Sequence, residues 1–177
     1  HNQRNALASA AAALALDVPA AAIRAGLEAM RPVPGRLCWR EGISGARILD
    51  DTYNANPASL AAAIRVLAET SGRRWLVLGD MAELGNTARR LHRRAGWLAR
   101  AGGVERLFVI GALAPEVAAG FGPGAERFDD REALVEVLCA ALGPGVAVLI
   151  KGSRAAAMDR IAERLAIAKP HAAGMGG

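Results

Sequence analysis

Residues 75–79 read Trp-Leu-Val-Leu-Gly, residues 107–110 read Leu-Phe-Val-Ile, and residues 146–150 read Val-Ala-Val-Leu-Ile. Each of these runs is short, continuously apolar and bounded by turn residues, as in strands that are buried on both faces of a sheet. A stretch with helical periodicity follows each run. This alternation predicts an α/β fold, in which a mostly parallel sheet has helices on both faces.

Shorter segments complete the predicted domain. Residues 37–41 and 46–51 have strand character and are separated by a glycine-bounded turn. The remaining predicted elements are a helix from Asn56-Pro57 to about Thr70, a short edge strand at Arg127-Phe128, a helix from about Arg154 to Ala168, and a disordered Gly-rich end.

The beginning of the chain has a different pattern. Residues 2–16 are rich in Ala and Leu, and Asp17-Val18-Pro19 separates them from an amphipathic stretch at residues 20–30, which predicts two helices. Two prolines and a glycine within residues 31–36 block a helix and indicate a linker. We therefore expect domains at residues 1–33 and 34–168, followed by a tail at residues 169–177.

Composition limits the function classes. The chain has 177 residues, and 53% of them are apolar, which is enough for one substantial core. Its formal net charge is +5. Its arginine pairs are spread out without interleaved aromatic residues, so solvated helix faces are favoured over nucleic-acid binding. Cys38 and Cys139 lie far apart, which favours reduced thiols and a cytoplasmic location. No apolar run reaches about 18 residues, so we expect no membrane span.

Polar segments follow three of the predicted strands. They are Asp50–Pro57, Gly79–Gly85 and Lys151–Arg154. Because the carboxyl ends of parallel strands meet at one rim of a sheet, we expect these segments to converge there, where ligands bind in such folds. Asp51 suits a ribose or a cation, and Asn54 and Asn56 suit a neutral polar ligand. Helix capping is an equal alternative for these residues.

Charged residues in the other two segments suit charged ligands. Lys151 and Arg154 flank Gly152-Ser153 at an expected helix start, which favours an anion. Asp80 and Glu83 suit an ammonium group. His92 lies on the following predicted helix, and a structural role is favoured for it because a lone His is more often structural.

Two further features precede the predicted sheet. Asn2 and Asn5 would share a helix face, where side-chain amides can bind the edge of adenine or cap the helix. Arg36, in the proline-bounded linker, could place its guanidinium in a cleft and bind a phosphate, or lie on the surface.

These pieces together resemble the Mur ligases, ATP-dependent amide ligases of bacterial cell-wall synthesis. The resemblance extends from residue 1 to about residue 165. Tyr-Asn-Ala-Asn-Pro and Gly-Asp-Met-x-Glu-Leu-Gly are its specific parts, whereas folylpolyglutamate synthases usually have Tyr-Ala-His in the first stretch. The matching motifs are His1-Asn2-x-x-Asn5, Val33-Pro34-Gly35-Arg36, residues 50–57, residues 78–85 with His92, and residues 151–158.

The resemblance implies a three-domain enzyme that joins D-alanyl-D-alanine to UDP-N-acetylmuramoyl tripeptide with ATP and Mg²⁺, through an acyl phosphate. Residues 1–33 would be the helical end of the central ATP-binding domain, and residues 34–168 the C-terminal Rossmann-like domain. The sequence contains no phosphate-loop motif, so we expect the Mg²⁺ ligands elsewhere, no metal ligands here, and no activity of this chain alone. A monomer that binds neither nucleic acid nor membrane is expected.

The resemblance also implies roles for individual residues. Arg36 and Asp51 would act in catalysis and, together with Asn2 and Asn5, contact the nucleotide. The residues that would line the cleft or bind the tripeptide and dipeptide are Tyr53, Asn54, Asn56, Asp80, Glu83, Lys151, Ser153 and Arg154.

Three alternatives stay open. The first is a Mur-type ligase for another amino acid. The second is a signalling receiver domain, because Asp50-Asp51, Asp80 and Lys151 would form an acidic pocket with a lysine. The third is a nucleotide-binding module without catalysis.

Overall fold

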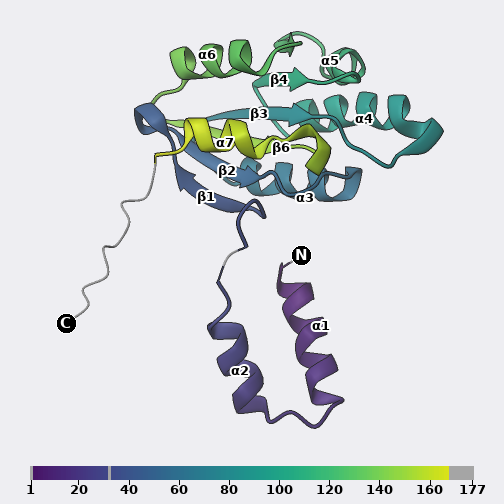
Figure 1. Cartoon of the computed structure of the whole chain (residues 1–177), viewed down its shortest axis with the longest axis vertical. Helices are drawn as coiled ribbons and strands as arrows, with labels where there is room; N and C mark the ends of the chain where they lie inside the picture. Colours follow the sequence, from purple (N-terminus) through teal and green to yellow (C-terminus); the bar gives the residue numbers. More distant parts are fainter. Residues whose placement is uncertain (1, 32, 168–177) are drawn as a thin grey trace. The chain divides into compact units, whose positions relative to one another are not determined.

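The computed structural model describes residues 2–31 and 33–167 of the chain, except the side chains of residues 2–4. The chain divides into two compact units, His1–Val33 and Pro34–Gly177, and each is described by itself (Figure 1). The assignment of the first unit to the end of an ATP-binding domain stays a prediction. The predicted tail at residues 169–177 lies outside the described residues.

The first unit is a pair of helices, α1 at Asn2–Leu14 and α2 at Ala20–Glu28. Asp17 adopts a left-handed conformation, with φ of 57°, and the Val18 N–H donates to the Ala13 carbonyl, so the chain ends α1 in a closed turn. Pro19 then precedes α2 at its N-cap. The prediction of two helices is confirmed, with each helix ending two residues earlier than expected.

The second unit is built on a six-stranded sheet with the order β1-β2-β6-β3-β4-β5. β1 pairs with β2 in the antiparallel direction, and all the other pairs are parallel. The predicted mostly parallel sheet, including its edge strand, is confirmed. The strands are β1 (Cys38–Glu41), β2 (Arg47–Asp51), β3 (Arg73–Gly79), β4 (Arg106–Ile110), β5 (Ala125–Phe128) and β6 (Val146–Lys151).

Helices cover both faces of this sheet (Figure 1). Along β3, Leu76 and Leu78 point into the core beneath α3, α4 and α5, while Trp75 and Val77 point into the core beneath α6 and α7. This alternation is why the strand is apolar at every buried position. The helices are α3 (Pro57–Ala68), α4 (Ala88–Ala101), α5 (Ala114–Phe121), α6 (Arg131–Ala141) and α7 (Asp159–Leu165).

The predicted last helix is corrected at its start. Instead of a helix from Arg154, the chain forms a 3₁₀ turn at Arg154–Ala156, then a left-handed Ala157 with φ of 47°, and α7 begins only at Asp159. This reversal places Met158, which is fully buried, against Gly79 and Gly152 at the ends of β3 and β6. The interruption of the helix therefore coincides with the burial of a large apolar side chain, which is favourable.

Candidate functional site

The ends of β2, β6 and β3 lie next to one another, because these three strands are neighbours in the sheet. Asp51 of β2 is in register with Lys151 of β6, and Lys151 is in register with Leu78 of β3. The three polar segments therefore meet at one rim, as the sequence predicts.

The centre of this rim is an ion pair between Asp51 and Lys151. Lys151 Nζ lies 2.5 Å from Asp51 Oδ2 and donates a second hydrogen bond to the Asn54 carbonyl at 2.8 Å. The other carboxylate oxygen of Asp51 accepts from the Leu37 N–H at 3.1 Å. Because Lys151 is only 1% exposed, its ammonium ties β2, β6 and the loop after β2 together without contacting solvent.

Burial shifts the pKa of both partners toward their neutral forms. Desolvation raises the pKa of Asp51 above 3.8, although the hydrogen bond and charge of Lys151 act in the opposite direction. Desolvation likewise lowers the pKa of Lys151 below 10.5, against the effect of Asp51. Desolvation is therefore the largest cause of both pKa shifts, and the hydrogen bond and charge attraction between the two side chains oppose it.

Arg36 and Tyr53 form the exposed side of the rim. The Arg36 guanidinium lies 4.1 Å from the centre of the Tyr53 ring, a cation–π contact. The Tyr53 N–H donates to the Gly35 carbonyl at 2.9 Å, and Gly35 has φ of 71°, which favours glycine. Since Arg36 is exposed and Tyr53 is 46% exposed, a guanidinium and an aromatic face are both presented to a ligand.

The two asparagines after β2 have local hydrogen bonds. Asn56 caps α3, where its side chain accepts from the Ser59 N–H at 2.8 Å and the Ser59 hydroxyl accepts from the Asn56 N–H at 3.1 Å. The capping interpretation of Asn56 is therefore confirmed. Asn54 Oδ1 accepts from the Ala55 N–H at 2.8 Å, and the Asn54 side chain is exposed at the rim.

Asp80 organises the neighbouring loop. Its carboxylate accepts from the N–H groups of Ala112 and Leu113 at 2.9 and 3.1 Å, just before α5. Its carbonyl accepts from the Ser153 N–H at 2.9 Å, which joins the β3 and β6 ends. Glu83 is exposed in a left-handed conformation, with φ of 61°. Ammonium binding by Asp80 and Glu83 stays a prediction, and the Asp80 carboxylate already has two backbone donors.

The premise for anion binding at Lys151 is wrong. No α-helix starts at Gly152-Ser153, and the Lys151 ammonium points to Asp51. Ser153 is buried, whereas Arg154 is exposed. Arg154 is therefore the member of this segment whose side chain is open to a ligand.

His92 is a buried structural residue. Its Nε2 accepts from the Met81 N–H at 3.0 Å, and its Nδ1 lies 2.8 Å from the Ala88 carbonyl, so the proton is assigned to Nδ1. Asp80 Oδ1 lies 3.9 Å from Nε2, but a neutral ring that accepts at this nitrogen forms no ion pair. The favoured structural interpretation of His92 is confirmed.

No role was predicted for Arg40 from the sequence, and Asp50 was given a role only in the receiver-domain alternative. Arg40 Nη1 lies 3.1 Å from Asp50 Oδ2, and Asp50 Oδ1 accepts from the Thr52 hydroxyl at 2.7 Å. This network supports the backbone next to Asp51. The available signal was the glycine-bounded turn between residues 37–41 and 46–51. In the structure these strands are antiparallel, Cys38 is opposite Asp50 and Arg40 is opposite Ile48, so Arg40 and Asp50 are diagonal neighbours.

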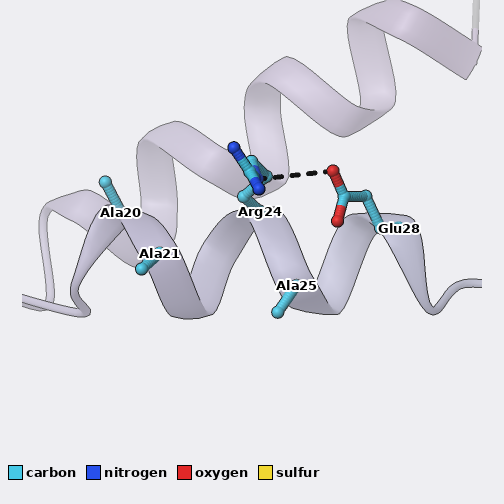
Figure 2. A pocket seen from close by; sticks show the side chains of 5 residues that line it. All are labelled: Ala20, Ala21, Arg24, Ala25 and Glu28. Carbon is cyan, nitrogen blue, oxygen red and sulfur yellow. Dashed lines mark ion pairs between the residues drawn. The ribbon is translucent and has the colours of Figure 1, made fainter.

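The first unit carries candidate nucleotide contacts at its start. Asn2 begins α1, and the side chain of Asn5 is exposed one turn later. The hollow drawn in Figure 2 lies along α2, where Arg24 and Glu28 form an exposed ion pair at 3.4 Å among three alanines. It contains none of the predicted site residues.

The described residues include neither a cluster of metal ligands nor a membrane-spanning helix. Within residues 2–31 and 33–167, no group of three or more His, Cys, Asp or Glu residues could hold a metal ion. In the same part of the chain, no helix has the length and apolar character needed to cross a membrane.

Comparison with known families agrees with this geometry. Residues 35–154 match the family described as Mur ligase, glutamate ligase domain. The chain belongs to the Mur ligase family. Membership removes the receiver-domain alternative, and it makes the rim of residues 51, 80 and 151 part of a Mur ligase domain.

Relatives of this Mur ligase chain have one name in common. The UDP-N-acetylmuramoyl-tripeptide--D-alanyl-D-alanine ligase of Escherichia coli (strain K12) is 40% identical over 167 residues, which cover 93% of this chain and 37% of the relative. The ligase of the same name from Treponema pallidum (strain Nichols) is 38% identical over 170 residues, which cover 91% of this chain and 36% of the relative.

Solved structures of Mur ligases have the same fold. MurF from Acinetobacter baumannii has a TM-score of 0.80 at 30% identity, over 92% of this chain and 37% of that one. The MurF ligase from Thermotoga maritima in complex with ADP has a TM-score of 0.68 at 30% identity, over 77% of this chain and 31% of that one. The chain therefore spans little more than a third of the length of the relatives it matches.

Proposed function

We propose that this chain is the C-terminal part of an ATP-dependent ligase that joins D-alanyl-D-alanine to UDP-N-acetylmuramoyl tripeptide. The observation that carries the proposal is the similarity over 93% of the chain to a ligase with that name. Tyr-Asn-Ala-Asn-Pro at residues 53–57 supports this substrate over those of other Mur-type ligases. The proposed enzyme is cytoplasmic and monomeric.

The proposed reaction has two steps. The tripeptide carboxylate attacks the γ-phosphate of ATP, which releases ADP and forms an acyl phosphate. The dipeptide amine then attacks the acyl carbon, and phosphate leaves from the tetrahedral intermediate as the amide bond forms. Water must be excluded in between, since it would hydrolyse the acyl phosphate. A domain that closes over the nucleotide would provide this exclusion.

Arg36 and Asp51 are proposed to act on the nucleotide. The exposed guanidinium of Arg36 suits a phosphate oxygen, and its stacking on Tyr53 restricts where it can reach. Asp51, oriented by Leu37 and Lys151, would face the ribose or phosphate region. Asn2 and Asn5 would contact adenine. The Mg²⁺ ions that accompany ATP would be held mainly by residues outside this chain.

The remaining rim residues are proposed to face the reacting ends of the two substrates. Arg154 is exposed and suits a carboxylate of the dipeptide or tripeptide, whereas Lys151 would act indirectly by holding Asp51. The other proposed contacts are Tyr53, Asn54, Asp80 and Glu83, whereas Asn56, which caps α3, and the buried Ser153 are proposed to support the rim from beneath. Since this chain lacks a phosphate-loop motif, we propose that it is inactive alone.

The proposed ligase activity is tested by joining this chain to the rest of a Mur ligase. This chain would replace the corresponding C-terminal part of the Escherichia coli relative, and ATP-dependent joining of D-alanyl-D-alanine would be assayed. Arg36→Ala and Asp51→Asn should each lower kcat/KM by about 10²-fold or more, as the loss of a charged catalytic contact does. Arg127→Ala, at another exposed arginine, is the matched control.

The results of this assay test the residue roles and the proposed substrate separately. Wild-type rates in Arg36→Ala or Asp51→Asn, with an unchanged far-UV spectrum, would remove that residue from the site. A folded chimera that binds the substrates but joins a different amino acid would replace the proposed substrate.

A further inference from the structure

The outer face of α4 is the most basic surface segment of the second unit. Residues 89–94 read Arg-Arg-Leu-His-Arg-Arg, and all four arginines are exposed while His92 is buried. One turn later Trp97 is 58% exposed. The proposed ligase reaction uses none of these arginines, and Trp97 places a large apolar side chain on the same helix.

Half of this basic face already binds a carboxylate within the molecule. Arg89 Nη1 lies 3.7 Å from Glu116 Oε1, and Arg93 Nη2 lies 3.4 Å from Glu116 Oε2. Arginines four residues apart on α4 are therefore spaced to hold one glutamate between them, as helical neighbours at this spacing can.

The other half repeats the arrangement without a carboxylate. Arg90 and Arg94 have the same spacing, one residue further round the helix, and neither has an ion pair within residues 2–31 and 33–167. Trp97 follows Arg94 by three residues, so it continues the same stripe. Arg90, Arg94 and Trp97 are called the α4 stripe below.

The α4 stripe stands on a rigid base. A Cβ at Gly96 would overlap the Val117 carbonyl, and a Cβ at Gly120 would overlap the Arg93 carbonyl, so α4 and α5 pack backbone against backbone. The ring of His92 fixes the start of α4 to Met81. The backbone that carries the α4 stripe is therefore fixed before a partner binds, which lowers the entropic cost of binding.

We propose that the α4 stripe is a docking surface for an acidic helical segment of a partner protein. A carboxylate of the partner would lie between Arg90 and Arg94, as Glu116 lies between Arg89 and Arg93, and an apolar side chain would cover Trp97. Arginine and tryptophan are the residue types that most often dominate binding at protein interfaces. The inference is independent of the proposed ligase function.

The test uses a defined probe and the 177-residue chain. A labelled 14-residue helical peptide would carry glutamates four residues apart with leucines beside them, and its scrambled isomer would keep the composition. Binding would be followed by fluorescence anisotropy. Arg90→Glu with Arg94→Glu should weaken binding at least about tenfold, as loss of close interfacial charge pairs does, and Trp97→Ala should weaken it also.

Controls separate geometry from net charge. Arg65→Glu with Arg127→Glu makes the same change in charge at two other exposed arginines and should leave affinity unchanged. A peptide with lysines in place of the glutamates should bind the Arg90→Glu, Arg94→Glu variant and not the wild type. Equal binding of the scrambled peptide, or equal loss in the control variant, would overturn the proposal. The proposal would also be overturned if Arg90 and Arg94 were needed for binding to phosphatidylglycerol vesicles but not for binding to the peptide.

Discussion

Asp51 and Lys151, one hundred residues apart in the chain, form a buried ion pair at 2.5 Å where β2 and β6 end side by side. Lys151 is 1% exposed and the Asp51 side chain 12% exposed. Removing two charges from water costs several kcal/mol per ion, and mutual attraction offsets this only when the remaining donors are also satisfied. The hydrogen bonds from the Leu37 N–H to Asp51 and from Lys151 to the Asn54 carbonyl contribute to that condition.

Replacing one partner of this ion pair should therefore lower the free energy of unfolding more than replacing both partners does. Lys151→Met leaves the Asp51 carboxylate without its partner and should lower the free energy of unfolding by about 3–5 kcal/mol. Lys151→Met with Asp51→Asn removes both charges and should recover most of that loss. Urea unfolding of the wild type, both single variants and the double variant measures the coupling. Additive single-variant effects would show that the pair contributes no coupling energy.

The pKa of Asp51 sets a pH dependence opposite to that of most carboxylates in ion pairs. Because burial raises its pKa above 3.8, the folded state takes up a proton at higher pH than the unfolded state. The stability contributed by this group is fully present below pH 3.8 and is lost as the pH rises through the folded-state pKa.

The Lys151→Met, Asp51→Asn variant isolates this effect. The free energy of unfolding of the wild type, minus that of the double variant, should fall as the pH rises from 3.8 through the folded-state value. Urea titrations at closely spaced pH values between about 3.5 and 6.5 measure the difference. A difference that rises with pH would show that Lys151 lowers the pKa of Asp51 more than burial raises it.

The glycine before Ser153 should be intolerant of a side chain. A Cβ at Gly152 would lie 2.5 Å from Met158 Cγ and 3.3 Å from the Cα of Gly79. Gly152→Ala should therefore cost about 1–3 kcal/mol through overpacking, measured by urea unfolding. Gly143→Ala is the matched control, since nothing lies within 4 Å of its Cβ. Equal effects at the two glycines would mean that Met158 can move aside at little cost.

The sheet was predictable because its signal is local. Three continuous apolar runs bounded by turn residues predicted β3, β4 and β6, and their parallel direction implied that the polar ends of β2, β3 and β6 would meet. The direction in which single side chains point could not be predicted from the sequence. Lysine is almost never fully buried without a partner, and the partner of Lys151 lies on a strand near the other end of the chain.

The turn after β6 was missed for a similar reason. Residues 154–165 have acceptable helix propensity, and no glycine or proline marks the left-handed Ala157. This conformation accompanies the burial of Met158 against Gly79 at the end of β3 and Gly152 just after β6, which is a tertiary contact that no local pattern records. The anion expected at Lys151 and Arg154 rested on the same helix start, so that premise is corrected together with the helix, whereas anion binding by the exposed Arg154 stays a prediction.

His92 gives the most direct test of how the rim is held, because each of its ring nitrogens has one backbone partner. His92→Phe would fill much of the same space but leave the Met81 N–H buried without an acceptor, which costs about 1–3 kcal/mol. His92→Gln keeps an acceptor and should lose less. Amide hydrogen exchange distinguishes a local effect from a global loss of stability. In His92→Phe the Met81 amide should lose more protection than the fall in global stability explains. The amides of Leu107 and Val109 in β4 should change only as much as global stability does. Unchanged protection at Met81 would mean that water or another group replaces the ring, and that His92 acts only by packing.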